Sequence, residues 1–331
     1  MVISSLFKME LRHLRYFTAV AEYLNYSEAS RRIHVAQTAI SQTILDLEEE
    51  LGLRLLLRNR RTVRLTAAGE IFRREALETL RRNEEAVRLA KRASLGEVGQ
   101  LRIGFAAATV AFLPALVQEY HRRFPDVELT LLELLPAEQV KAFDEGRLDV
   151  GFSRALPADW SREFHEDVVY TDYLHLALPS THPLTLNWAR DGTIHIKRLA
   201  GEKFVLLQRE VAPGLYDDVL AFCRHAGKFS PHVVNVADHA SSVLLLVESG
   251  IGVSILPGSL HHLIRAGEPV VFCRLQPDSA PIEFRMSWRR SVPSSPTVEA
   301  FREVVQSQLE AIHALMEARP SEEKQRQWHR S

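Results

Sequence analysis

Cysteine is scarce in this chain. Cys223 and Cys273 are the only two among 331 residues, so at most one disulfide can form, and no cysteine spacing typical of a zinc site is present. A chain of this size with two cysteines is typical of a reducing compartment. The composition therefore indicates neither a disulfide-stabilised secreted domain nor a metal-binding one.

Long apolar runs are also missing. No segment approaches the roughly 20 apolar residues that a membrane helix needs. The first residues, MVISSLFKMELRHLRYF, are interrupted by Lys8, Glu10, Arg12 and Arg15, which argues against a signal peptide. We therefore expect a cytoplasmic protein that makes no membrane contact.

Catalytic motifs are absent as well. The sequence has no Gly-x-Ser-x-Gly, Gly-x-x-x-x-Gly-Lys, His-Glu-x-x-His or Cys-x-x-Cys. The adjacent pair His261 and His262 lacks a third ligand at a recognisable spacing, which indicates structural or solvated side chains. We expect no enzyme, no cofactor and no metal; an enzyme that uses an α/β cleft remains an alternative that a turnover assay would reveal.

Charge is unevenly distributed, although the net charge is only −1. Residues 1–95 hold 17 Lys and Arg against 12 Asp and Glu, a net +5, and the remainder holds 24 against 30, a net −6. This asymmetry is expected where a nucleic-acid-binding segment is joined to a neutral or acidic domain. The length suggests two or three domains.

The basic segment, residues 1–95, contains a short amphipathic helix. Ile40, Ile44, Leu47 and Leu51 recur at i, i+4, i+7 and i+11, which places one apolar stripe against a core. The opposite side carries Thr38, Gln42, Leu45 and Glu49, with Ser41 on a flank. Glutamine can pair with adenine in the major groove, and serine or threonine can donate or accept, so this face suits base reading.

The segments on both sides of this helix support the same interpretation. A preceding helix, with Ser27 as its N-cap, would brace the reading helix through Ala29, Ile33 and Val35. The following text has a strand–turn–strand pattern with five arginines and no acid: Arg54, Arg58, Arg60, Arg61 and Arg64. These features predict a basic wing beside a reading helix; the alternative is a plain antiparallel helix pair.

Two further helices complete the N-terminal part. The first is predicted by apolar residues at three- and four-residue spacing: Leu11, Leu14, Phe17, Val20, Ala21 and Leu24. The second is a long polar helix to about Ser94, with Thr66 as its N-cap. It carries a seam of period 3.5, formed by Ala76, Leu80, Asn83, Val87 and Ala90, which is typical of a dimerisation helix; an isolated solvated linker is the alternative.

Beyond a glycine-flanked joint at residues 95–99, strands and helices alternate. We expect strands at 101–106, 127–134 and 148–153 and helices at 109–124 and 137–145. A second unit follows, with strands at 173–178, 203–207, 232–236 and 252–256 and helices at 214–226 and 240–249. Strands 270–275 and 283–289 lead into a helix, 297–316, which should return to the first unit. The pattern predicts two α/β lobes with parallel sheets and a cleft between them.

The segment MELRHLRYFTAVAEYLNYSEASRRIHVAQTAISQTILDLEEELGLRLLLRNRRTVRLTAAG closely resembles LysR-type transcriptional regulators. Leu-Arg-x-Leu-x-x-Phe, the Val-Ala-Gln turn, Ile-Ser-x-x-Ile-x-x-Leu-Glu and Arg-Leu-Thr-x-x-Gly carry the resemblance over about sixty residues. In the second half, GRLDVGFSR and ESGIGVSILP resemble the family's periplasmic-binding-protein-like effector domain. The family pattern starts at Met9, so we expect residues 1–8 to be an extension or a misassigned start.

The resemblance implies a winged helix-turn-helix at 1–66, a dimerisation helix and hinge at 67–98, and an effector domain at 99–331. Lobe I would comprise about 99–171 plus 276–318, lobe II about 172–275, and 319–331 a flexible tail. It further implies a homotetramer built as a dimer of dimers that binds double-stranded promoter DNA, with RNA polymerase as a possible partner. A pure small-molecule binding protein with a helical dimerisation head is the alternative; it would show no salt-sensitive DNA binding.

The candidate DNA-contacting residues are Arg31, Gln37, Thr38, Ser41, Gln42, Arg58, Arg60, Arg61 and Arg64. We expect the polar residues to face bases and the wing arginines to contact phosphates or the minor groove. Thr38 stands where the family often has proline, and Gln42 where several members carry arginine.

Open parallel sheets bind ligands at the carboxyl ends of strands. The candidate effector-binding residues at these ends are Ala107, Ala108, Thr109, Pro136, Arg154, Gln208 and Gly214. A guanidinium such as that of Arg154 matches a carboxylate bidentately, whereas a structural ion pair is the alternative. The sequence also resembles the LysR branch that senses aromatic-degradation intermediates, in which an arginine follows Gly-Phe. Ala108 and Pro136 replace hydroxyl residues of relatives, which argues against a dicarboxylate and favours a more apolar effector. We expect a small organic acid or an aromatic compound.

Overall fold

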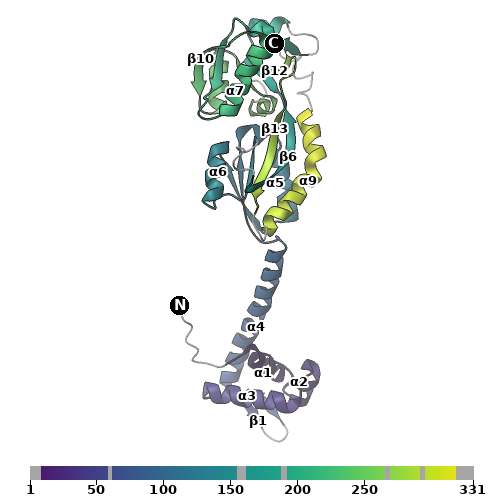
Figure 1. The fold of residues 1–331 in the computed structure, drawn as a ribbon. Helices are drawn as coiled ribbons and strands as arrows, with labels where there is room; N and C mark the ends of the chain where they lie inside the picture. Colours follow the sequence, from purple (N-terminus) through teal and green to yellow (C-terminus); the bar gives the residue numbers. More distant parts are fainter. Residues whose placement is uncertain are drawn as a thin grey trace. The chain divides into compact units, whose positions relative to one another are not determined.

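The computed structural model describes residues 9–58, 62–154, 162–187, 192–264, 269–290 and 295–317 (Figure 1). The chain forms two compact units, residues 1–92 and 93–331. Each unit has its own hydrophobic core. No helix in these described ranges is long and apolar enough to cross a membrane.

The N-terminal unit is three helices, a hairpin and the start of a long helix. Its elements are α1 (Leu11–Tyr23), α2 (Tyr26–Ile33), α3 (Gln37–Leu51), β1 (Leu56–Arg58), β2 (Val63–Leu65) and α4 (Ala67–Ser94). The predicted stripe of α3 is confirmed, because Ile40, Ile44 and Leu47 are fully buried. They pack with Phe17 and Val20 of α1. Each helix thus hides one apolar face and leaves the other exposed.

One helix cap and two apolar positions of this unit differ from prediction. The N-cap of α2 is Asn25, whose side chain accepts hydrogen bonds from the Ser27 and Glu28 amides, so the assignment to Ser27 was wrong. Asparagine and serine are both favoured N-cap residues, and positions 25 and 27 are so close that the sequence pattern alone does not decide between them. Leu11 and Leu24 lie outside the core, at 37% and 45% exposure.

The cap of α4 is as predicted. The Thr66 hydroxyl accepts from the Gly69 amide at 2.8 Å, which satisfies one of the free N–H groups at the start of the helix. The same hydroxyl donates to the backbone of the preceding wing segment, at Arg54. The wing therefore leads directly into α4.

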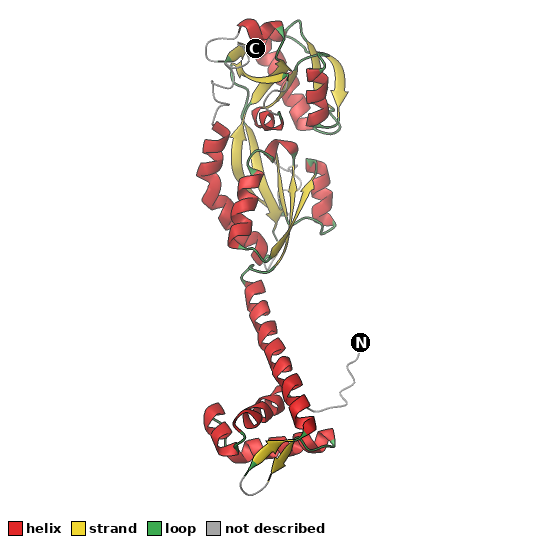
Figure 2. Ribbon diagram, turned by 180° about the vertical axis from the view of Figure 1, so that it is seen from behind, coloured by secondary structure: helices red, strands yellow, loops and turns green. Residues whose placement is uncertain are grey.

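Lobe I of the second unit is a five-stranded sheet in the order β4-β3-β5-β13-β6. Its strands are β3 (Gly99–Phe105), β4 (Val127–Glu133), β5 (Val150–Arg154), β6 (Phe164–Asp172) and β13 (Ile282–Arg289). The first three are parallel and β13 is antiparallel to both neighbours. Helices α5 (Leu113–Arg123) and α9 (Pro296–Glu317) cover one face of the sheet and α6 (Pro136–Asp144) the other (Figures 1 and 2).

The predicted return of the last helix to lobe I is confirmed. Phe301 of α9 lies edge-on to Tyr120 of α5, with ring centroids 5.1 Å apart. The helix predicted at 109–124 was placed too early, since a 3-10 turn, η1 (Ala107–Thr109), precedes α5. Pro114 lies at the second position of α5, where its missing N–H costs nothing.

Lobe II is inserted between β6 and β13. Its strands are β7 (Leu174–Pro179), β8 (Thr193–His195), β9 (Lys203–Leu207), β10 (His232–Ala237), β11 (Ser254–Pro257) and β12 (Val270–Gln276). Its helical segments are η2 (Pro183–Asn187), η3 (Ile196–Leu199), α7 (Pro213–Phe222), η4 (Cys223–Gly227), α8 (Ala240–Glu248) and η5 (Gly258–Leu263). The strands are not all parallel as expected, because β11 and β12 both run antiparallel to β7. A strand that enters from lobe I and one that returns to it must run in opposite directions.

Candidate functional site

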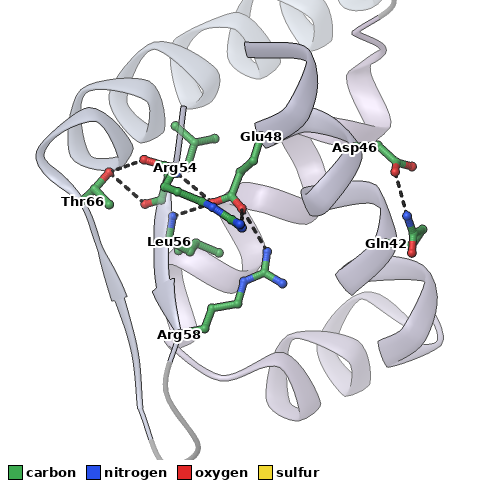
Figure 3. Close-up of polar contacts among 8 residues, drawn as sticks. Gln42, Asp46, Glu48, Arg54, Leu56, Arg58 and Thr66 are labelled. Atoms are coloured by element: carbon green, nitrogen blue, oxygen red, sulfur yellow. Dashed lines mark hydrogen bonds and ion pairs between the residues drawn. The ribbon is translucent and has the colours of Figure 1, made fainter. Parts of the chain in front are cut away.

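The outer face of α3 presents the polar residues that the sequence assigned to DNA. Thr38 and Gln42 are exposed and Ser41 is half-buried. Gln42 Nε2 donates to Asp46 Oδ1 at 2.8 Å, one helical turn further on (Figure 3). Because Asp46 accepts only, it orients the amide and leaves Gln42 Oε1 and one N–H available, which is the pair of groups that adenine engages.

The start of α3 is held by the preceding helix. The Ser27 hydroxyl donates to Gln37 Oε1 at 2.8 Å, so this predicted base contact already has an internal partner. The N-cap residue of α3, Ala36, provides no side-chain acceptor for the first-turn amides. Such a helix start suits a phosphate oxygen.

Glu48 lies at the centre of the N-terminal unit and was missed in the sequence. Its side chain is 3% exposed, and Oε1 accepts hydrogen bonds from the amides of Leu55 and Leu56, both at 2.8 Å (Figure 3). Oε2 receives Arg54 at 3.1 Å and Arg58 at 3.4 Å. One carboxylate therefore ties the reading helix to the first strand of the wing.

A signal for Glu48 was present in the sequence. It follows Ile44 by four residues and adjoins Leu47, which places it on the apolar stripe of α3. A charged residue on such a stripe is buried only when it is paired. The signal is hidden by the run Glu48-Glu49-Glu50, which has the composition of a solvated face.

Arg58 is occupied inside the unit. Besides Glu48, its guanidinium lies over the ring of Tyr26, 5.1 Å from the centroid, and its side chain is only 26% exposed. Burial raises the pKa of Tyr26 to about 12, so the ring stays neutral beneath the cation. The guanidinium of Arg58 thus joins α2, α3 and β1, and its contact with phosphates stays a prediction.

The other predicted basic contacts differ in accessibility. Arg64 is exposed on β2. Arg31 is exposed and pairs with Glu28 on its own helix at 2.5 Å. Arg60 and Arg61 lie outside the described residues.

The predicted seam of α4 is only partly outward. Ala76 is 2% exposed within the single chain, so a second copy would have little of it left to cover. Leu80 and Asn83 are half-buried, Val87 is 50% exposed and Ala90 is exposed. The part of the seam that could meet a partner helix therefore begins at Leu80.

In the second unit, two predicted effector residues meet where the lobes approach one another. Arg154 ends β5 of lobe I, and a Cβ on Gly214 of α7 would lie 3.7 Å from Arg154 Nη1. Arg154 Nη2 is paired with Asp218 of α7 at 2.5 Å, whereas Nη1 is buried and has no hydrogen-bond partner among the described residues. Asp218 was not predicted, because 64 residues separate it from Arg154.

The remaining effector candidates are covered or used internally. Ala107 and Ala108 of η1 pack against the core of lobe II, and the Thr109 hydroxyl donates to the Ala106 carbonyl at 2.8 Å. Pro136 is the first residue of α6 and is half-buried. Gln208 is also half-buried, and its backbone N–H donates to the Ala237 carbonyl. Two cavities of about 210 and 230 Å³ lie elsewhere, and none of the predicted effector residues lines either. The Arg154–Asp218 ion pair thus connects the two lobes at this point.

Comparison with known proteins identifies both units. Residues 11–70 match the model of the bacterial regulatory helix-turn-helix protein of the lysR family, and residues 94–310 match the LysR substrate binding domain. The chain belongs to the LysR family of transcriptional regulators. LysR-type proteins bind DNA through the first of these domains and a small-molecule effector through the second, so the alternative without a DNA role is set aside.

Individual relatives cover most of the chain. The regulator AlsR of Bacillus subtilis is 40% identical over 77% of this chain and 82% of its own length. The regulator CatR of Pseudomonas putida is 34% identical over 83% and 96%. Full-length CbnR in complex with its target DNA superposes with a TM-score of 0.78 at 28% identity, over 91% of this chain and all of CbnR.

The two cysteines of this LysR family member are poorly placed for redox or metal chemistry. Cys223 and Cys273 are free, buried thiols, and burial raises the pKa of both, that of Cys223 to about 12. A raised pKa keeps the thiol protonated and unreactive. Within the described ranges, no three His, Cys, Asp or Glu side chains form a group that could hold a metal ion.

We therefore expect the native protein to react very little with Ellman's reagent at pH 8, because neither thiol is ionised or accessible. Absorbance at 412 nm should show two thiols per chain only after denaturant is added. Rapid reaction of the native protein would contradict the burial of these side chains.

Proposed function

We propose that this regulator reads its operator with Thr38, Ser41 and Gln42 of α3, while Arg64 and the other exposed basic groups of the head contact phosphates. The observation that carries the proposal is the outward polar face of α3, in which Asp46 orients the Gln42 amide. Gln37 and Arg31 would contact DNA at the edge of this face, and each already has a partner within the protein: Ser27 for Gln37 and Glu28 for Arg31. Arg60 and Arg61 are proposed from sequence alone.

We further propose that the regulator acts in the cytoplasm as a homo-oligomer, a dimer of dimers, with α4 as one of its contacts. Exposed Val87 and Ala90 and half-buried Leu80 support a helix–helix seam. Two heads held by such a seam could occupy successive major grooves. RNA polymerase as a partner is proposed from the family resemblance.

For the effector, we propose an organic acid whose carboxylate binds Arg154 between the lobes. The unpartnered Nη1 supports this, because a guanidinium can serve both oxygens of a carboxylate at once. Ala107, Ala108 and Pro136 would provide apolar walls, and Thr109, Gln208 and Gly214 would border the site.

Gln42→Ala should reduce discrimination between the operator and base-substituted operators by about 1 to 3 kcal/mol at one position of each half-site. Base edges would lose a bidentate partner, while phosphate contacts would remain. Fluorescence anisotropy with a set of substituted operators measures this change. An unaltered preference at every position would remove Gln42 from the base contacts.

Arg64→Ala should behave differently, by weakening binding to all DNA sequences about equally and lowering the slope of log K against log salt by about 1. Arg64 is exposed on β2 of the wing and is not on the face of α3 that we propose reads bases. Titrations of operator and random DNA at several salt concentrations provide the measurement. A loss confined to operator DNA would contradict a phosphate contact.

Arg154→Ala should abolish the rise in melting temperature that small carboxylates give the wild-type chain. Arg209→Ala is the matched control, since Arg209 is an exposed arginine paired with Asp217 of the same helix α7. The control should keep the full rise. If Arg154→Ala kept it too, Arg154 would not hold the effector.

A further inference from the structure

The proposed effector arginine already has an ionic partner in the structure. Arg154 of lobe I and Asp218 of lobe II form an ion pair at 2.5 Å, which bridges the lobes where the proposed carboxylate would bind. Building on the proposed function, we propose that Asp218 is an internal counter-ion that a carboxylate effector must displace. Asp218 would then set the effector concentration to which the regulator responds.

The first argument is the geometry around the guanidinium. Gly214 and Asp218 are four residues apart on α7 and therefore lie on the same side of that helix. Arg154 lies along this side, with Nη1 near Gly214 and Nη2 on Asp218. A ligand carboxylate that accepted from both Nη1 and Nη2 would meet the Asp218 carboxylate at Nη2 and be repelled by its charge.

The second argument is that this pair is incomplete. Asp218 engages Nη2 alone, and in the part of the chain that the structure describes Nη1 is buried with no acceptor. A buried donor without a partner is costly, more so on a charged group. A carboxylate that accepted from both nitrogens would remove this cost, so the exchange of Asp218 for an effector would gain a hydrogen bond.

The third argument is that Asp218 can leave at little cost. Its side chain is 49% exposed, so it can turn to solvent, and a half-exposed ion pair contributes little to stability. Its neighbour Asp217 is engaged elsewhere, because both of its oxygens accept from Arg209, at 2.9 and 3.0 Å. After exchange, Asp218 would still lie near the bound carboxylate and repel it.

The pair also selects among effectors. A carboxylate can compete with Asp218 for the guanidinium, whereas a neutral compound of the same shape cannot. Asp218 would therefore disfavour neutral analogues and make acids the ligands that reorganise the contact between lobes.

The test compares wild type, Asp218→Asn and Asp217→Asn as full chains, titrated with acetate and benzoate and with their neutral amides. Asp218→Asn should bind the carboxylates about two- to fivefold more tightly than wild type, the scale expected for a partly exposed charge pair. Its affinity for acetamide and benzamide should not change. Asp217→Asn should match wild type, and Asp218→Glu should restore weak binding.

Accessibility of the arginine gives a readout that needs no ligand. Modification of Arg154 by phenylglyoxal, followed by mass spectrometry, should be several-fold faster in Asp218→Asn than in wild type. Carboxylate affinity equal to or below wild type in Asp218→Asn would overturn the counter-ion while leaving the carboxylate site intact. Absence of Arg154-dependent carboxylate binding in every variant would overturn both the counter-ion and the proposed effector class.

Discussion

Replacing Glu48 with alanine is expected to lower the free energy of unfolding of the N-terminal unit by about 2 to 4 kcal/mol. The substitution leaves the amides of Leu55 and Leu56 without acceptors in the protein interior. Loss of the ion pairs with Arg54 and Arg58 adds less, since those side chains are 68% and 26% exposed and can turn to water. The unsatisfied backbone groups therefore dominate the effect.

Hydrogen exchange of peptides from residues 11–65, measured in the full chain, provides the opening free energy. Glu48→Gln is the matched control, because its amide oxygen can still accept from both backbone groups while its nitrogen cannot pair with an arginine. We expect Glu48→Gln to lose less than half as much stability as Glu48→Ala. Equal exchange in wild type and Glu48→Ala would show that the carboxylate does not hold the wing.

Gly69→Ala is expected to destabilise the same unit by about 2 kcal/mol or more, although alanine is the better helix former. Helix propensity alone would favour alanine by about 1 kcal/mol. A Cβ at this position, however, would lie 2.1 Å from the Leu55 carbonyl oxygen. That oxygen already accepts from the Thr66 amide at 2.9 Å, so it cannot move without breaking the junction between wing and α4.

The size of the propensity effect can be measured on the same helix. Ala86 is at an exposed position of α4. Ala86→Gly should lower the free energy of unfolding by about 1 kcal/mol, which would show that α4 favours alanine over glycine where no contact interferes. Gly69→Ala should change stability in the destabilising direction despite that preference. A gain in protection of the head peptides on substitution of Gly69 would contradict the close approach of Leu55.

Features that depend on local pattern were predictable. The burial of Ile40, Ile44 and Leu47 follows from their spacing, and the Thr66 cap follows from one hydroxyl before a helical run. The outward position of Gln42 follows from the same helical period. Each of these depends on residues close together in sequence, where periodicity and capping chemistry are decisive.

Features that depend on tertiary pairing were not predictable. In the sequence, Arg58 is one of several arginines that could contact phosphates. Only the tertiary structure shows that Glu48 and Tyr26 surround its guanidinium. Asp218 is one of many acids in the second half, and only the fold brings it to Arg154. Strand direction in lobe II likewise depended on how the chain enters and leaves that lobe.

The insertion of lobe II has a consequence for the modularity of the protein. Asp172, the last residue of β6, and Ile282, the first of β13, are paired directly across neighbouring antiparallel strands. Residues facing each other in this way are separated by about 5 Å, a gap that a short turn can close. Lobe II could therefore be excised or exchanged between these two residues, so that the sensory half of the cleft could be transplanted while the sheet that carries Arg154 is retained.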